Sequence, residues 1–177
     1  MGVWTILGNH DYATYMAGTD ASRRQAIKKL CHIERQMGWQ LLLNENRALY
    51  RNGDSIFIAG MENDGQPPFP STANAARTMQ GIPPSAFTLM LEHDPSSWTR
   101  TILPKTTAQL TLSGHTHGGQ IQLFGMRFTQ IRQAHDLGLY CENGRYLYVN
   151  AGLGGVVPLR FNVNPEITVI TLKKSKT

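Results

Sequence analysis

Short apolar stretches alternate with polar segments along this chain, and three of them end directly in a histidine-containing motif. These stretches cover residues 3–7, 87–91 and 109–112. Apolar runs of this length, bounded by glycine, proline or other turn residues, are typical of buried strands. The pattern therefore predicts three strands that deliver polar, metal-binding side chains at their carboxyl ends, where ligands gather at the edge of a sheet.

The rest of the pattern predicts helices between further short strands. Apolar spacing at the helical period predicts a helix that begins at a cap, Asp20 or Ser22, and runs to about Met37. Further strands are expected over residues 40–44, 47–50, 55–59, 145–150 and 167–172, and helical segments over 71–80 and 96–103. An Asn-Gly pair between the second and third of these strands predicts a primed hairpin turn. Alternating strands and helices indicate an α/β fold.

Each strand that ends near a histidine carries its own motif. The three motifs read Gly8-Asn9-His10-Asp11-Tyr12, Glu92-His93-Asp94-Pro95 and Ser113-Gly114-His115-Thr116-His117-Gly118-Gly119-Gln120. If the third strand continues through its motif, His115 and His117 share a face with Cα atoms roughly 6 to 7 Å apart. Such a pair suits two neighbouring metal ions, which lie ~3.5–4 Å apart in hydrolytic centres. A pair of exposed turn histidines is the alternative.

The order of these motifs resembles that of the calcineurin-like metallophosphoesterases. A Gly-Asn-His-Asp motif, a histidine at a strand end and a Gly-His-Thr-His motif follow one another as in that family, and Tyr12 with the closing Gly152-Leu153-Gly154 looks most like its bacterial YaeI/YkuE-type branch. The resemblance runs from residue 3 to about residue 172. It implies a single domain over residues 1–177 in which two mixed β-sheets pack together with helices outside, an α/β sandwich.

Two motifs of the family have no counterpart in this chain. Family members carry Asp-x-His and Gly-Asp-x-x-Asp before Gly-Asn-His-Asp, whereas Gly8 follows only seven residues here. We therefore expect an N-terminally truncated domain that lacks the first strands and has impaired activity. Such a domain would expose a sheet edge that is open to self-association.

The resemblance also assigns roles to the residues that are present. Asn9, His93 and His115 would bind one metal ion and His117 the other. His10 would act on the phosphate, either as an acid or by stabilising developing charge. The family implies two divalent ions, Mn, Fe or Zn, and the hydrolysis of a phosphomonoester or phosphodiester.

Two other interpretations of the histidines stay open. The first is a non-catalytic fragment that binds one metal ion or a phosphate group. The second is a mononuclear hydrolase, which would need a carboxylate such as Asp11 or Asp94 as its base. Glu92 and Asp94, which flank His93, depart from the family pattern and are either partners of the metal ligands or solvated charges.

Composition and charge add only slightly to the prediction of the domain organisation and of the binding partners. The 177 residues, 41% of them hydrophobic, suffice for one domain-sized core. A net charge of +5 favours a phosphorylated substrate or an anionic membrane surface, and no nucleic-acid-binding motif accompanies it.

The cysteines and the apolar runs bear on where the protein resides. Cys31 and Cys141 have no CxxC spacing, so two reduced thiols and a cytoplasmic location are expected for this chain. No run approaches the ~20 apolar residues that span a membrane. Because hydrophobic or targeting segments often precede the first motif in this family branch, membrane association of a full-length protein stays open.

Overall fold

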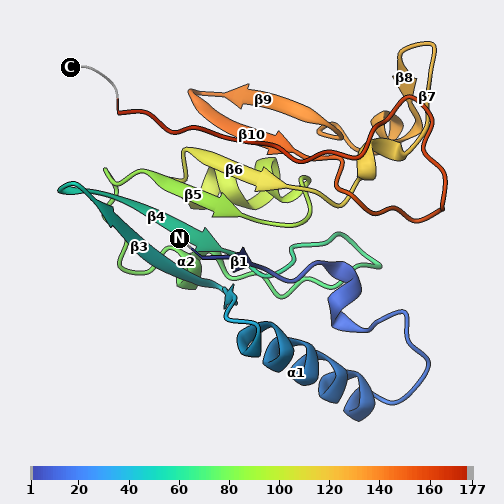
Figure 1. Ribbon diagram of the computed structural model, residues 1–177, viewed down its shortest axis with the longest axis horizontal. Coiled ribbons are helices and arrows are strands. Elements are labelled where there is room, and N and C mark those ends of the chain that lie inside the picture. The colour runs from blue at the N-terminus through green and yellow to red at the C-terminus, as the bar shows by residue number, and fades with distance from the viewer. Residues whose placement is uncertain (1, 175–177) are drawn as a thin grey trace.

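Residues 2–174, which the computed structural model describes, form one six-stranded mixed sheet and two smaller two-stranded sheets (Figure 1). The order of the large sheet is β3-β4-β5-β6-β10-β9, with bounds Glu45–Arg51, Asp54–Gly60, Thr88–Leu91, Leu110–Ser113, Arg145–Val149 and Gly138–Glu142. The four central strands run parallel, and the two edge strands are antiparallel to their neighbours. The predicted α/β class with mixed sheets is therefore confirmed.

The strand before the first motif belongs to a separate small sheet. β1 (Trp4–Thr5) pairs in parallel with β2 (Gln40–Leu41), and α1 (Asp20–Gln36) packs against this pair through a cluster that contains Leu7, Cys31 and Leu41. The predicted helix is confirmed, but the prediction of its cap was wrong. The side chain of Thr19 is the cap and accepts a hydrogen bond from the Ser22 amide.

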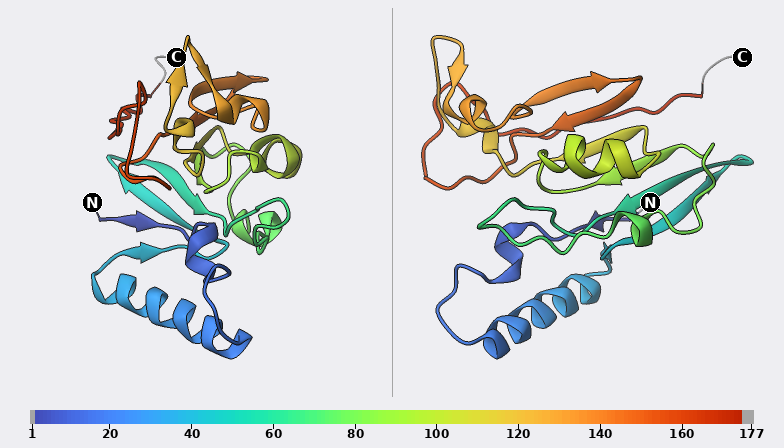
Figure 2. Two further views of the ribbon diagram at one scale, coloured as in Figure 1. Left: turned by 90° about the vertical axis from the view of Figure 1, so that its right-hand side faces the viewer. Right: turned by 180° about the vertical axis from the view of Figure 1, so that it is seen from behind.

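The main core lies between the large sheet and the helical segments on one of its sides (Figure 2). These segments are α2 (Ala75–Thr78), η2 (Trp98–Ile102) and α3 (Leu103–Lys105). Met90 and Leu147, on β5 and β10, are completely buried against Trp98 and Ile102. Because β5 and β6 are held from this side, the loops that follow them emerge together at one edge of the sheet.

The hairpin prediction was correct, whereas the last predicted strand was wrong. β3 and β4 pair across Asn52 and Gly53, both with positive φ as a primed turn requires. Residues 167–172 form no strand: β10 already pairs with β6 on one side and β9 on the other, so no edge of β10 is left. Only side-chain bonds, such as that from Asn150 to the Thr168 hydroxyl, tie this stretch to the sheet.

An unpredicted hairpin follows the third motif. β7 (Gln122–Leu123) and β8 (Met126–Arg127) pair antiparallel and lead into η4 (Phe128–Ile131). No helix within residues 2–174 is long and apolar enough to cross a membrane.

Candidate metal centre

Three donor atoms from the three histidine motifs converge at the edge of the large sheet. The Asn9 Oδ1 atom lies 2.9 Å from His93 Nε2 and 3.1 Å from His115 Nδ1, and the two imidazole nitrogens are 3.2 Å apart. Asn9 belongs to η1 (Asn9–Tyr12), whereas His93 and His115 follow the neighbouring strands β5 and β6. The structure thus brings together the three residues predicted to share one ion.

Two glycines allow the first motif to approach the sheet this closely. A Cβ atom at Gly60, at the end of β4, would lie 2.3 Å from Leu42 Cβ and 2.9 Å from a side-chain atom of Ile6. A Cβ atom at Gly8 would lie 2.8 to 2.9 Å from three atoms of the His93 ring. Because glycine has no Cβ atom, the segment that carries Asn9 can pack directly onto β4 and His93.

The spacing and chemistry of the three atoms fit one divalent metal ion. Donor atoms ~2.1 Å from one ion lie ~3.0 Å apart in an octahedron and ~3.4 Å apart in a tetrahedron. Burial, followed by the neighbouring charge of His115, lowers the pKa of His93 to about 4, and burial also lowers the pKa of His115. Both rings are therefore neutral near pH 7, the form in which imidazole binds metals.

Residues around the three donors orient them. The Asn9 Nδ2 group donates a hydrogen bond of 2.8 Å to the Tyr15 hydroxyl, which turns Oδ1 toward the histidines. The outer Nε2 atom of His115 faces an Asp94 carboxylate oxygen at 4.0 Å. Metal-binding histidines commonly have a carboxylate or carbonyl on the side away from the ion. Tyr15 was not predicted, because its place six residues after Asn9 follows no periodic pattern.

Both carboxylates beside His93 are buried, so of the two alternatives for these residues, partners of the metal ligands or solvated charges, the second was wrong. The Asp94 side chain accepts hydrogen bonds from the Ser96 amide at 2.9 Å and from Gln133 at 3.2 Å. Glu92 is completely buried and accepts a hydrogen bond from the Asp64 amide at 2.9 Å. Burial holds the pKa of Glu92 well above its usual range. These contacts hold the loop after β5 in place.

His115 and His117 do not lie on a strand, and the prediction that they share a strand face was wrong. β6 ends at Ser113, and both histidines have positive φ values, 68° and 54°. The buried Thr116 fixes this turn, because its hydroxyl donates to the Asp136 carbonyl and accepts from the Gly118 amide. Within residues 2–174, no hydrogen bond joins the His117 ring to the three-donor cluster.

His10 and His117 lie near this cluster without being part of it. The exposed His10 ring stacks on Tyr15, with ring centroids 4.5 Å apart. Burial lowers the pKa of His117, and the charges of Arg160 and His10 lower it further. The charge of His10 also acts on His93 and His115. The four histidines therefore lie within one another's electrostatic field.

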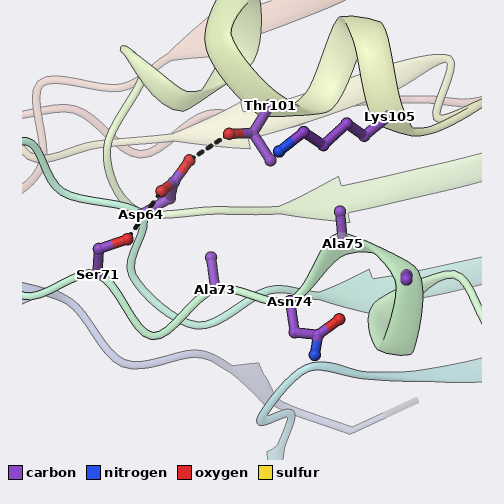
Figure 3. A pocket seen from close by; sticks show the side chains of 8 residues that line it. Asp64, Ser71, Ala73, Asn74, Ala75, Thr101 and Lys105 are labelled. Atoms are coloured by element: carbon purple, nitrogen blue, oxygen red, sulfur yellow. Dashed lines mark hydrogen bonds between the residues drawn. The ribbon is translucent and has the colours of Figure 1, made fainter.

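A cavity of about 570 Å³ lies elsewhere, and Figure 3 shows that none of the predicted site residues lines it. Asp64 accepts hydrogen bonds there from Thr101 at 2.6 Å and from Ser71 at 3.1 Å, and it pairs with Arg100 at 3.0 Å. Although burial alone would raise the pKa of Asp64, these partners lower it. The contacts give Asp64 a structural role that joins η2 to the loop before α2.

The sequence is similar to several proteins named as phosphoesterases. The metallophosphoesterase YkuE of Bacillus subtilis is 33% identical over 98% of this chain and 57% of its own length. Phosphodiesterase YaeI of Escherichia coli is 33% identical over 60% of this chain and 36% of its own. UDP-2,3-diacylglucosamine pyrophosphatase LpxG of Chlamydia trachomatis is 26% identical over 96% of this chain and 64% of its own. No family model and no solved structure matches the chain.

The histidines of this site follow the carboxyl ends of two neighbouring strands, which is where ligands bind in α/β folds. Relatives named metallophosphoesterases match 98% or more of this chain, which supports the calcineurin-like metallophosphoesterase family that the order of its motifs predicted. The relatives named above are hydrolases, and the family implies divalent metal ions. The chain spans about half the length of the curated relatives that it matches, 57% in the case of YkuE.

Proposed function

We propose that this chain is a single metallophosphoesterase domain that binds a divalent metal ion through Asn9, His93 and His115. The observation that supports this proposal is the convergence of three neutral donor atoms, all within 3.2 Å of one another, from three separate segments. Manganese, iron and zinc all accept such a set of one amide oxygen and two imidazoles. When bound by these three residues, such an ion would supply Lewis-acid polarisation of a phosphoryl oxygen.

The remaining histidines act around this ion in our proposal. His10, which is exposed and stacks on the Tyr15 ring, gives a proton to the leaving oxygen in this proposal. His117 serves a second ion, and its backbone is fixed by a hydrogen bond of 3.2 Å from Arg160 to the His117 carbonyl.

The substrate in this proposal is a phosphodiester or a pyrophosphate. One relative is named a phosphodiesterase and another a UDP-2,3-diacylglucosamine pyrophosphatase, which supports this class. The free thiols of Cys31 and Cys141 fit the reducing cytoplasm as the location of this chain.

A second candidate function is that of a metal-binding fragment without turnover. Within residues 2–174, no group of three histidine, cysteine or acidic side chains is arranged to hold a metal ion. The three donor atoms at the cluster, from Asn9, His93 and His115, include no carboxylate oxygen that could bridge two ions. In this second function the chain would bind one ion per molecule and would not hydrolyse a phosphoester.

Metal analysis combined with an activity assay tests these functions. The chain is dialysed against Mn²⁺, its metal content is measured, and hydrolysis of bis-p-nitrophenyl phosphate is followed. His93→Ala should lose the ion, whereas His32→Ala, which removes an exposed histidine of α1, should keep it. Binding with hydrolysis supports the enzyme, and binding without hydrolysis supports the fragment. Unchanged metal content in His93→Ala would contradict the ligand assignment.

A further inference from the structure

An exposed apolar surface lies beside the proposed metal centre. We call it the apolar rim and define it by Phe124, Met126, Phe128, Ile131, Val156 and Leu159. Their exposed fractions lie between 59% and 98%, with Phe124, at the tip of the β7–β8 hairpin, the most exposed. Figure 1 shows this hairpin and the loop after β10 at the same end of the molecule. Exposed apolar side chains gathered in this way mark an interaction site.

Hydrogen bonds join the two segments of the apolar rim to each other. The Gln120 side chain donates to the Leu159 carbonyl at 2.7 Å and accepts from the Val156 amide at 2.6 Å. The Phe161 amide donates to the Gln120 carbonyl at 2.8 Å, and the Gln122 amide donates to the Phe161 carbonyl at 2.9 Å. The apolar side chains are therefore carried on a connected platform and not on independent loops.

The same platform is attached directly to the third histidine motif. Gln120 ends that motif, and its amide donates to the His117 carbonyl at 3.2 Å. Arg160, in the middle of the second segment, donates to the same carbonyl and to the Ala151 carbonyl. The position of the apolar rim relative to the histidines is therefore set by hydrogen bonds from both segments, one from the Gln120 backbone and the others from the Arg160 side chain.

The charge around the apolar rim is positive. Residues 120–135 and 150–162 contain Arg127, Arg132 and Arg160 but no aspartate or glutamate. Arg127 is neutralised by Asp136, which is buried and lies 2.7 Å from its Nε atom. The hydrogen bonds of Arg160 go to carbonyl oxygens, which leave its charge in place. Within residues 2–174, neither Arg132 nor Arg160 forms an ion pair, and an apolar surface flanked by such cations is complementary to an anionic lipid surface.

We propose that the apolar rim docks on an anionic lipid bilayer, so that the histidine cluster faces phosphoester groups in the headgroup layer. The apolar tips enter the boundary between headgroups and acyl chains, and Arg132 and Arg160 attract the anionic headgroups. A second copy of the chain is a poorer occupant, because two apposed rims would bring like charges together. The substrate class, a lipid-borne phosphoester, rests on the proposed function, whereas the membrane contact does not.

Vesicle co-sedimentation of the 177-residue chain tests the docking. Wild type should bind phosphatidylcholine vesicles that contain phosphatidylglycerol and bind pure phosphatidylcholine vesicles less well. Phe124→Glu combined with Ile131→Glu should weaken binding by at least ~10-fold, since it puts two acids on the tips that enter the lipid. Tyr50→Glu is the matched control: Tyr50 is 80% exposed on β3, and its replacement should leave binding unchanged.

Four outcomes would overturn the docking. They are an absence of vesicle binding by wild type, equal binding by the double variant, equal binding to both vesicle types, and dimerisation without lipid that the double variant abolishes. Hydrolysis of soluble bis-p-nitrophenyl phosphate, measured on the same proteins, should not change in the double variant. Vesicle binding without any hydrolysis would reject only the proposed function, and hydrolysis without vesicle binding would reject only the docking.

Discussion

Replacing Gly8 by alanine should disable the metal centre while leaving the fold in place. Gly8 has φ −98° and ψ 176°, values that alanine adopts without strain. The added Cβ atom would, however, lie 2.8 Å from His93 Cε1 and Nδ1 and 2.9 Å from Cγ. Since carbon atoms in contact lie ~3.5–4.0 Å apart, the His93 ring must retreat by roughly 0.7 Å or more.

This displacement is large compared with what a metal site tolerates. Ligand distances in such sites hold to within about 0.2 Å, so a shift of this size takes His93 out of reach of an ion bound by Asn9 and His115. We expect the dissociation constant for Mn²⁺ to rise by ~10–100-fold, which corresponds to about 1.4–2.8 kcal/mol. The overpacking itself should cost about 1–3 kcal/mol of unfolding free energy at most.

Isothermal titration with Mn²⁺ and thermal unfolding together measure the two effects. Gly114→Ala is the matched control, because Gly114 also adjoins a proposed ligand but its added Cβ atom would meet only the Asn150 carbonyl oxygen at 4.0 Å. It should bind Mn²⁺ as wild type does. In a His93→Ala background no ring is left to displace, so Gly8→Ala should have no further effect. A folded Gly8→Ala protein with wild-type affinity would refute the reasoning.

The remaining predictions concern the surroundings of the site and the core. Tyr15→Phe keeps the ring against His10 but removes the acceptor for the Asn9 amide; the Mn²⁺ dissociation constant should rise ~10-fold, and an unchanged value in a titration would contradict this role. Asp136→Asn should cost ~3 kcal/mol in urea unfolding at neutral pH because the buried pair with Arg127 is broken. Burial alone would raise the pKa of Asp136, but the hydrogen bonds from Arg127 outweigh it and lower the pKa. The stability that the carboxylate contributes is therefore complete above its unfolded pKa of ~3.9 and is lost as the pH falls through the lower folded value; acidification below that pH should lower the melting temperature of wild type more than that of Asp136→Asn, and parallel curves would contradict the assignment. Leu147→Ala, at a completely buried position in β10, should lower the unfolding free energy by ~2–5 kcal/mol in the same urea assay.

Local sequence patterns predicted much of the fold. The helical period over residues 20–36 and the Asn-Gly turn after β3 predict α1 and the β3–β4 hairpin, because both depend on contacts within a few residues. The same reasoning failed for residues 167–172. Their alternation is typical of a strand, but a strand also needs a free neighbouring edge, and β9 and β6 occupy both edges of β10.

The sequence likewise identified the ligand motifs but did not predict their arrangement in space. Motif order alone identified Asn9, His10, His93, His115 and His117 as candidates and indicated the family, which the relatives support. The turn at the third motif could not be foreseen. It depends on a hydrogen bond from a buried threonine to a carbonyl twenty residues away.

The sequence by itself thus determined the residue types at the strand ends, the main helix and hairpin, and the family resemblance. Only the tertiary structure decided that Asn9, His93 and His115 meet at hydrogen-bonding distance, whereas the His117 ring makes no hydrogen bond to them. It also decided that Tyr15 orients the Asn9 amide. The physical reason is that periodicity and turn propensity act over a few neighbouring residues. Asn9 meets His93, which lies 84 positions further along the chain, and His115, which lies 106 positions further along. These contacts depend instead on strand order and close packing.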